Sequence, residues 1–320
     1  MSTLLEVRNV SKSFNLKDGN VKACSNVNLK IHRGEILGLV GESGSGKTTM
    51  SNLILGLETP DEGEIFFKDQ ELSEIITKDQ KLFRRGVQGV FQQPLLALDS
   101  LRTIQWSMTE PLVVHDIGNS ASRKVKVREL LGLVGLDETY LQRYPNQLSG
   151  GQLQRVNIAR ALALSPELLI CDEAVSALDV SVQAQIINLF LEIKSSLGVA
   201  LLFISHDLEV VRHLSDRIVV MYAGSFVEES KTDDLVENPL HPYSRALLSA
   251  SSIHDSTEAD NWDMSTFRRE DLPLVGCKFA PRCRYAEDSC RENEPETRSF
   301  GADRQSACFK TEVLFLKGNQ

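Results

Sequence analysis

The chain has 320 residues, of which 42% are hydrophobic and 25% are charged, and its formal net charge is −9. This is the composition of an ordinary globular protein with one large or two modest domains, and the negative charge argues against nucleic acid as the main partner. No uninterrupted apolar run reaches the roughly 18 residues of a membrane span. Residues 1–9 lack the layout of a signal peptide, which predicts a cytoplasmic protein.

The first part of the chain predicts three strands. Leu5–Val10 and Val27–Ile31 alternate between apolar and polar residues, and Glu64–Phe67 follows a turn at residues 59–63. Phe14 lies just after the first of these strands. Its ring could stack on a purine, but from the sequence alone packing in the core is the simpler interpretation.

A glycine loop lies between the apolar strand Ile36–Val40 and a helical pattern that begins near Met50. Strand, loop and helix are the context that the phosphate-binding motif G-x-x-x-x-G-K-[ST] requires. Lys47 is expected to reach the β- and γ-phosphates, and the Thr48 hydroxyl to bind Mg²⁺. The sequence therefore predicts a nucleoside triphosphate site formed by Gly41, Glu42, Ser43, Gly44, Ser45, Gly46, Lys47, Thr48 and Thr49.

A mostly helical insert is expected from about residue 95 to 165, after a buried strand Val87–Phe91 that ends at Gln92. The insert ends with a second glycine loop, Leu148–Gln152, which opens another helix and is again suited to face an anion. One nucleotide does not need two such loops. Either the chain binds two anions, or this loop serves a nucleotide that another copy holds.

Two acids end the next apolar strand, Leu168–Cys171. In phosphate-loop proteins the first acid of such a strand end, here Asp172, holds Mg²⁺, and the next, Glu173, is placed to accept a proton from the attacking water. A polar turn with Asp179 and a helix from about Ser181 to Ser196 follow.

His206 follows the buried strand Ala200–Ile204. A single histidine is more often structural than catalytic. Here it lies at a strand end, in line with Gln92 and Asp172, where open α/β sheets place their ligands.

The last part of the chain predicts a strand pair, two short helices (Thr232–Glu237 and Tyr243–Leu248), a polar linker over residues 254–269 and a segment rich in cysteine. Cys24 and Cys171 are expected to be core residues. The other four cysteines are separated by five, six and seventeen residues, which suits zinc or an iron–sulfur cluster, although the C-x₂₋₄-C start of a zinc knuckle is absent. The alternative is four reduced, partly buried thiols. They are Cys277, Cys283, Cys290 and Cys308.

With these motifs in order, residues 4 to 250 resemble the ATPase subunit of an ATP-binding-cassette (ABC) transporter, and Leu148–Gln152 resembles the signature of that superfamily. The resemblance implies that Phe14 stacks on adenine, that Gln92 touches Mg²⁺ and the attacking water, and that His206 contacts the γ-phosphate. It implies that Glu173 is the general base and that Asp179 lies in a loop at the dimer contact. It also implies that the opposite subunit's nucleotide is contacted by Ser149, Gly150, Gly151 and Gln152.

The finer resemblance is to the oligopeptide/dipeptide importers, on Asp172–Gln185, Asn238–Tyr243 and the cysteine segment. That group also includes nickel and glutathione importers. It implies ATP and Mg²⁺ as ligands, a [4Fe–4S] cluster on the four cysteines, two separate membrane permease subunits and an extracellular solute-binding protein. A second ATPase subunit is also implied, either an identical copy or, as is common in the group and favoured here, a different subunit, with the complex at the cytoplasmic face of the membrane. The other hypotheses, a non-transport ABC ATPase in DNA repair or translation and a P-loop kinase, fit less of the chain.

The expected fold is therefore α/β: a P-loop NTPase domain of ABC type with an antiparallel β subdomain and a helical insert, followed by a small cysteine-containing segment. The expected division is an ATP-binding domain over residues 1–253 and a C-terminal extension over residues 254–320.

Overall fold

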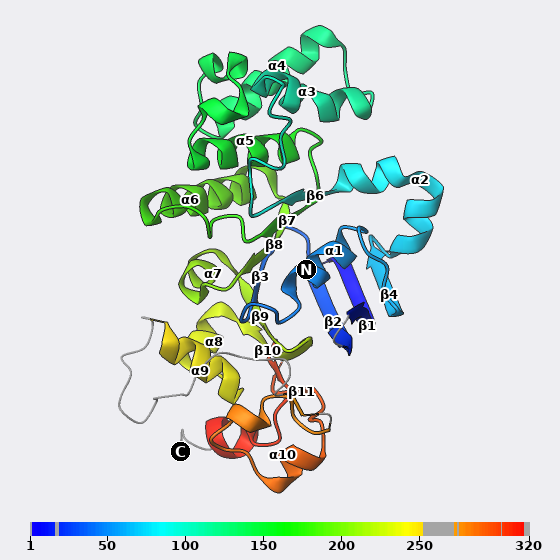
Figure 1. Cartoon of the computed structure of the whole chain (residues 1–320), viewed down its shortest axis with the longest axis vertical. Coiled ribbons are helices and arrows are strands. Elements are labelled where there is room, and N and C mark those ends of the chain that lie inside the picture. Colours follow the sequence, from blue (N-terminus) through cyan, green and yellow to red (C-terminus); the bar gives the residue numbers. More distant parts are fainter. Residues whose placement is uncertain (1, 17–18, 252–271, 274, 302, 317–320) are drawn as a thin grey trace.

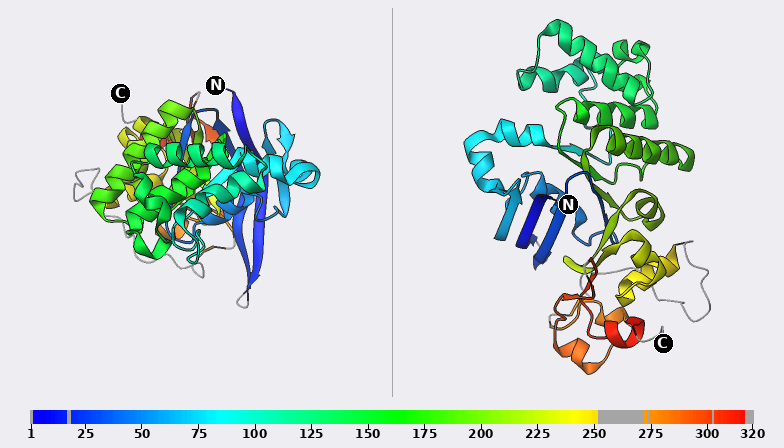
Figure 2. Two further views of the ribbon diagram at one scale, coloured as in Figure 1. Left: turned by 90° about the horizontal axis from the view of Figure 1, so that it is seen from above. Right: turned by 180° about the vertical axis from the view of Figure 1, so that it is seen from behind.

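Figure 1 shows the chain as a computed structural model that describes residues 2–16, 19–251, 272–273, 275–301 and 303–316. The predicted linker at residues 254–269 lies outside the described residues. Two sheets form the middle of the molecule. The helical insert lies at one end and the cysteine segment at the other, and the view from behind in Figure 2 agrees.

The larger sheet has eight strands in the order β11-β12-β10-β9-β3-β8-β7-β6. The run from β9 to β6 is parallel, whereas β10, β12 and β11 are added antiparallel. The strands are β3 (Ile36–Val40), β6 (Val87–Val90), β7 (Leu168–Asp172), β8 (Ala200–Ser205), β9 (Arg217–Tyr222), β10 (Ser225–Lys231), β11 (Arg298–Ser299) and β12 (Gln305–Ser306).

The strands β3, β7 and β8 are buried along their whole length, which is why each is a continuous apolar run rather than an alternating one. Successive side chains of β3 enter two different cores. Leu37 and Leu39 belong to the core shared with the smaller sheet, and Ile36 and Val40 belong to the core under the helices. The strand that leads into the phosphate loop is therefore held from both sides.

The smaller sheet is antiparallel, with the order β2-β1-β4-β5. Its strands are β1 (Thr3–Leu16), β2 (Gly19–His32), β4 (Glu62–Phe67) and β5 (Gln70–Glu71). Most of β2 alternates between buried and exposed residues, because only one face of this sheet is packed. The strands predicted from alternation are present, and the first two are longer than predicted.

The α-helices are α1 (Lys47–Ile54), α2 (Leu72–Gly86), α3 (Ile104–Val114), α4 (Ser120–Leu133), α5 (Gly150–Leu162), α6 (Val180–Leu197), α7 (Leu208–Leu214), α8 (Thr232–Glu237), α9 (Pro242–Ala250) and α10 (Asp288–Glu292). The predicted helical insert contains α3, α4 and α5 with two short 3₁₀ turns between α4 and α5. The sequence prediction missed α2 and α7. It also placed Phe91 in a buried strand, whereas β6 ends at Val90 and the side chain of Phe91 is exposed.

The cysteine segment continues the larger sheet. Strand β12 pairs with β10 through Glu228 opposite Ser306 and Glu229 opposite Gln305, and β11 pairs with β12. The cysteine segment is thus joined through β12 to the sheet that carries the phosphate loop.

The packing at Gly38 gives a test of this core. A Cβ atom on Gly38, in the middle of β3, would lie 2.2 Å from Cγ1 of Val211 and 2.7 Å from Oγ of Ser215, because α7 packs closely on the strand. We expect Gly38→Ala to lower the free energy of unfolding by about 1–3 kcal/mol, as overpacking of a core does. Urea unfolding measures this difference.

The matched control is Gly132→Ala in α4, where a Cβ meets nothing within 4 Å. Because alanine is the better helix former, the control is expected to be neutral or slightly stabilising. A Gly38→Ala protein as stable as the wild type would contradict the close packing of α7 on β3.

Candidate nucleotide-binding site

The phosphate loop joins the end of β3 to the start of α1. Gly46 has φ of 113°, and a Cβ atom there would lie 2.2 Å from the carbonyl oxygen of Ala23, so only glycine fits. Gly46 is also the residue that precedes α1, and no side chain caps the helix. The first N–H groups of α1 are therefore free of a side-chain cap and suited to bind an anion.

Lys47 is buried against its own loop. Its Nζ donates hydrogen bonds to the carbonyl oxygens of Gly41, at 2.7 Å, and of Glu42, at 3.0 Å. Burial lowers the pKa of Lys47, and the nearby carboxylates of Glu173 and Asp172 oppose that shift. The two carbonyls are neutral acceptors. A bound phosphate would be an anionic partner for this ammonium group and would form stronger, charge-assisted hydrogen bonds with it.

Asp172 has the properties of a metal ligand. It is 7% exposed at the end of β7, its Oδ1 is buried with no hydrogen-bond partner, and the Thr48 hydroxyl hydrogen-bonds to its side chain. Burial raises the pKa of the Asp172 carboxyl, and the bond from Thr48 opposes that rise. A buried oxygen without a partner beside a hydroxyl fits Mg²⁺, which takes few protein ligands and hard oxygen donors.

Glu173 is held in a strained backbone conformation beside His206. Its φ is +53°, and its N–H donates to the carbonyl of Ile204 on β8 at 3.0 Å. The Nδ1 of His206 lies 2.8 Å from Oε2 and 3.0 Å from Oε1 of Glu173. A non-glycine residue at positive φ is held there only by its surroundings, and such residues cluster at functional sites. The direct pairing of these two side chains was not predicted from the sequence.

One cavity of about 640 Å³ is lined by most of the predicted nucleotide site. Gln92 and Glu173 face it from the ends of β6 and β7, and His206 from the end of β8; Nε2 of Gln92 is also 3.4 Å from the Ser176 hydroxyl. Leu247 of α9 completes the lining. The loop residues that line it are Gly41, Glu42, Ser43, Gly44, Gly46, Lys47, Thr48 and Thr49.

Several predicted site residues do not line this cavity within the described part of the chain: Phe14, Ser45, Asp172, Asp179 and the signature residues 149–152. Ser45 is buried in its loop, and Asp172 lines the neighbouring cavity with Thr48 and Gln92. Phe14 is half-buried on β1, with Nζ of Lys12 5.5 Å from its ring centre, and it is not in either core, so the interpretation as core was wrong. Ser149 caps α5, accepting from the N–H of Gln152, and Asp179 caps α6. The signature loop therefore does not contribute to this cavity.

The four C-terminal cysteines line one small cavity together, and burial raises the pKa of Cys277 to about 11 and that of Cys283 to about 12. Their donor chemistry fits an iron–sulfur cluster, but in the described part of the chain no three His, Cys, Asp or Glu side chains are arranged to hold a metal ion. Cys24 and Cys171 are core residues, as predicted.

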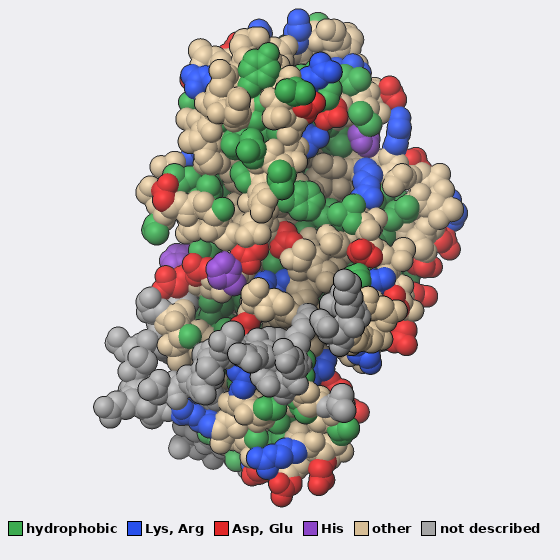
Figure 3. All heavy atoms as spheres, viewed as in Figure 1, with side chains coloured by type: hydrophobic (Ala, Val, Ile, Leu, Met, Phe, Trp, Pro, Cys, Tyr) green, Lys and Arg blue, Asp and Glu red, His purple; other side chains and the backbone are tan. Residues whose placement is uncertain are grey.

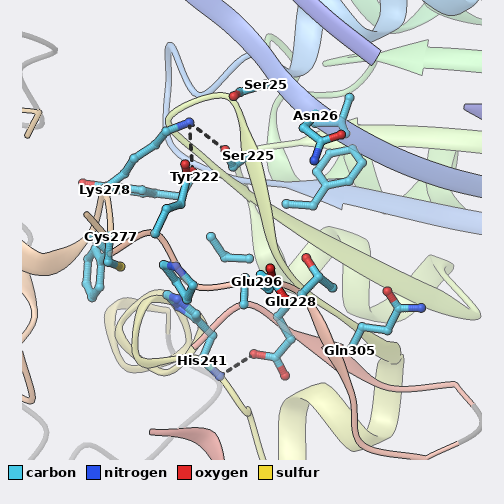
Figure 4. Close-up of a pocket in the computed structure, with 18 of the residues that line it drawn as sticks. Ser25, Asn26, Tyr222, Ser225, Glu228, His241, Cys277, Lys278, Glu296 and Gln305 are labelled. Carbon is cyan, nitrogen blue, oxygen red and sulfur yellow. Dashed lines mark hydrogen bonds and ion pairs between the residues drawn. The ribbon is translucent and has the colours of Figure 1, made fainter. Parts of the chain in front are cut away.

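A second surface cavity lies between β2, β10 and the cysteine segment (Figure 4). It measures about 590 Å³, and the buried Glu228 accepts hydrogen bonds from the backbone of Leu240 and His241 at 2.8 Å beside it. These bonds fix the chain that leads into α9.

Known proteins are similar to both parts of this chain. The ABC transporter family matches residues 24–176, and the oligopeptide/dipeptide transporter C-terminal region matches residues 227–290. The oligopeptide transport ATP-binding protein AppF of Bacillus subtilis is 42% identical over 96% of this chain and 97% of its own length. The dipeptide transport ATP-binding protein DppF of Haemophilus influenzae is 38% identical over 94% and 92%.

Among solved structures, a dimeric ATP-binding cassette in a post-hydrolysis state, bound to ADP and Pi, is similar with a TM-score of 0.65. It is 33% identical and covers 72% of this chain and 99% of its own. The resemblance and the α/β fold predicted from the motifs are thereby confirmed. The chain belongs to the ABC transporter family, as an ATP-binding and ATP-hydrolysing cassette with the oligopeptide/dipeptide transporter C-terminal region.

Proposed function

We propose that this chain is the ATPase subunit that powers uptake of di- and oligopeptides through separate membrane subunits. The observation that carries the proposal is the match over nearly the whole chain to peptide transport ATP-binding proteins, including the C-terminal region. We assign residues 1–253 to the ATP-binding domain, with the helical part at about 95–165, and residues 254–320 to the extension.

We infer the roles of the site residues from the motifs and from their places at the strand ends; Asp172 lines the neighbouring cavity together with Thr48, Gln92 and Glu173. Lys47 would leave the two carbonyls it now contacts and bind the β- and γ-phosphates of ATP. Thr48 and Asp172 would hold Mg²⁺, with Gln92 nearby; the ion, when bound, supplies positive charge that offsets the charge of the phosphates.

Glu173 would accept the proton of the attacking water, and the carboxylate would have to turn toward the phosphate to do so. His206 now holds that carboxylate through Nδ1. In the proposed cycle the imidazole gives up this contact and reaches the γ-phosphate, so one movement frees the base and adds a phosphate ligand.

A facing cassette would complete each site. In the proposed dimer the adenine stacks on Phe14, and Ser149, Gly150, Gly151, Gln152 and Asp179 serve the nucleotide held by the partner. Support comes from the exposure of Ser149 and Gly150 at the start of α5, outside their own cavity. We propose that the partner is a different ATPase subunit of the same group.

The membrane subunits would dock between the helical insert and β6. A cavity of about 730 Å³ there is lined by Phe91, Gln92, Leu96 and Val114, and Leu96 is 78% exposed. Figure 3 shows hydrophobic side chains from the insert down to the level of β6. Because Gln92 lines both this cavity and the nucleotide cavity, an apolar helix of a permease seated here would sense nucleotide binding.

Within the described residues, no helix is long and apolar enough to cross a bilayer. We therefore place the chain, as part of the proposal, at the cytoplasmic face of the membrane on two permease subunits. An extracellular solute-binding protein would deliver the peptide to those subunits.

The function itself is tested by uptake. Deletion of the gene is expected to abolish uptake of a radiolabelled dipeptide and a radiolabelled tripeptide, and the wild-type gene on a plasmid to restore it. Lys47→Ala should not restore uptake, because it removes the phosphate ligand. Loss of nickel or glutathione uptake with peptide uptake intact would overturn the assignment of substrate.

The role of Glu173 is tested by Glu173→Gln, which keeps the shape of the side chain but removes the base. Phosphate release is expected to fall by about 10²- to 10⁴-fold while nucleotide binding persists. Glu192→Gln, an exposed carboxylate on α6, is the control and should hydrolyse ATP like the wild type. Unchanged turnover in Glu173→Gln would remove this residue as the base.

We also propose that Cys277, Cys283, Cys290 and Cys308 hold a [4Fe–4S] cluster, supported by the donor chemistry of four thiols around one small cavity. Binding would require these thiols to rearrange, because within the described residues no three of them are arranged to hold a metal ion. Protein purified without oxygen is then expected to be brown and to contain iron, and Cys283→Ser to lose both properties. Cys24→Ala changes a core cysteine elsewhere and should keep them. Colourless, iron-free wild-type protein would end the cluster proposal.

A further inference from the structure

The cysteine segment is fastened to the ATP-binding part next to the phosphate loop. Nζ of Lys278 donates a hydrogen bond to the carbonyl of Ala223 at 3.1 Å. It donates another to the hydroxyl of Ser225 at 2.7 Å, which Figure 4 shows. Phe279 is 2% exposed and packs edge-on against Tyr222, with 5.2 Å between ring centres. These contacts fix the short turn Ala280–Arg282 that follows.

From this turn Arg282 reaches the phosphate loop itself. Its two terminal nitrogens lie 3.0 and 3.1 Å from the two carboxylate oxygens of Glu42, across 240 positions of sequence. This is the bidentate geometry that makes Arg–carboxylate pairs strong and directional. The Arg282 and Glu42 side chains are 15% and 22% exposed, so water screens the pair only in part.

Glu42 is also held through its backbone. Its N–H donates to the hydroxyl of Tyr243 on α9 at 3.0 Å, and its carbonyl accepts from Lys47. Glu42 therefore contacts three parts of the molecule: Lys47, which is expected to bind the phosphates, the helix α9, and the cysteine segment.

Arg282 offsets the negative charge of the Glu42 carboxylate. Glu42 lines the nucleotide cavity, and a carboxylate there repels the phosphates of ATP. Arg282 neutralises this carboxylate and holds it on the side of the cysteine segment. Without the arginine, the negative charge would be free to turn toward the phosphates.

We propose that Arg282 is a positioning residue for ATP: by pairing with Glu42 it keeps that carboxylate away from the triphosphate and couples the cysteine segment to the phosphate loop. The proposal rests on nucleotide binding in the cavity described above and does not require a metal on the cysteines. Because coupling is reciprocal, ATP binding should also stabilise the segment.

The test is a double-mutant cycle measured by calorimetric titration with a non-hydrolysable ATP analogue and Mg²⁺. We expect Arg282→Ala to weaken binding about tenfold, within the usual range for coupled sites. In a Glu42→Gln background the same Arg282→Ala change should alter affinity less than about twofold, because there is no carboxylate left to neutralise. In steady state, KM for ATP should rise with kcat little changed.

Two further variants separate positioning from mere attachment of the segment. Arg282→Lys keeps the charge but not the two-bond fork and should recover part of the lost affinity. Arg291→Ala changes an exposed arginine of the same segment that pairs only with Asp288 among the described ion pairs, and this variant should bind like the wild type. Hydrogen exchange of residues 276–290 should slow on nucleotide binding in the wild type and less so in Arg282→Ala.

Unchanged affinity in Arg282→Ala overturns the inference. The same loss in the presence and absence of Glu42→Gln also overturns it, because the arginine would then only support the fold. If the wild type does not bind the analogue, the proposed function fails as well, and that outcome is distinct from either of these.

Discussion

Parallel pairing of β3, β8 and β7 decides where the chemistry of this protein can take place. Val40 lies opposite Ser205, and Asp172 lies opposite Ile204, so the loop after β3, the acids after β7 and the histidine after β8 all leave the sheet at one edge. Because the three strands are buried on both faces, a shift of one residue would move side chains from one core into the other. Packing of the strands in the two cores therefore fixes the relative positions of the site residues, more than the contacts among those residues do.

Features encoded locally could be predicted from the sequence. The observed bounds of β3 and α8 are the ones predicted from the sequence. The phosphate loop is recognisable because its glycine, lysine and threonine residues must stand at fixed spacing. The helix α2 was missed because Asp79 interrupts its helical geometry. Only three residues of this helix are buried, Leu72, Ile75 and Phe83, so few positions mark its buried face. The exposure of Phe91 and the half-burial of Phe14 depend on neighbours distant in sequence, which periodicity does not report.

Pairs made between distant segments could not be predicted at all. Glu173 and His206 were each assigned a role, yet their contact follows from the positive φ of Glu173 and the register of β7 on β8. The same holds for Glu42 and Arg282, which belong to two separately matched regions of the chain. In sequence the C-terminal region is a separate extension, but in space Arg282 pairs with Glu42 of the phosphate loop. Lys278 and Phe279 hold the same segment on Ala223 and Tyr222.

The two short strands β11 and β12 have a consequence for how the protein behaves in a crowded solution. Strand β10 would otherwise present a row of unpaired backbone groups, and such a border invites pairing with another chain. Here β12 occupies it, and the outermost strand, β11, is only two residues long. The C-terminal segment thus closes this border of the larger sheet and leaves only a two-residue strand exposed there for pairing with another chain.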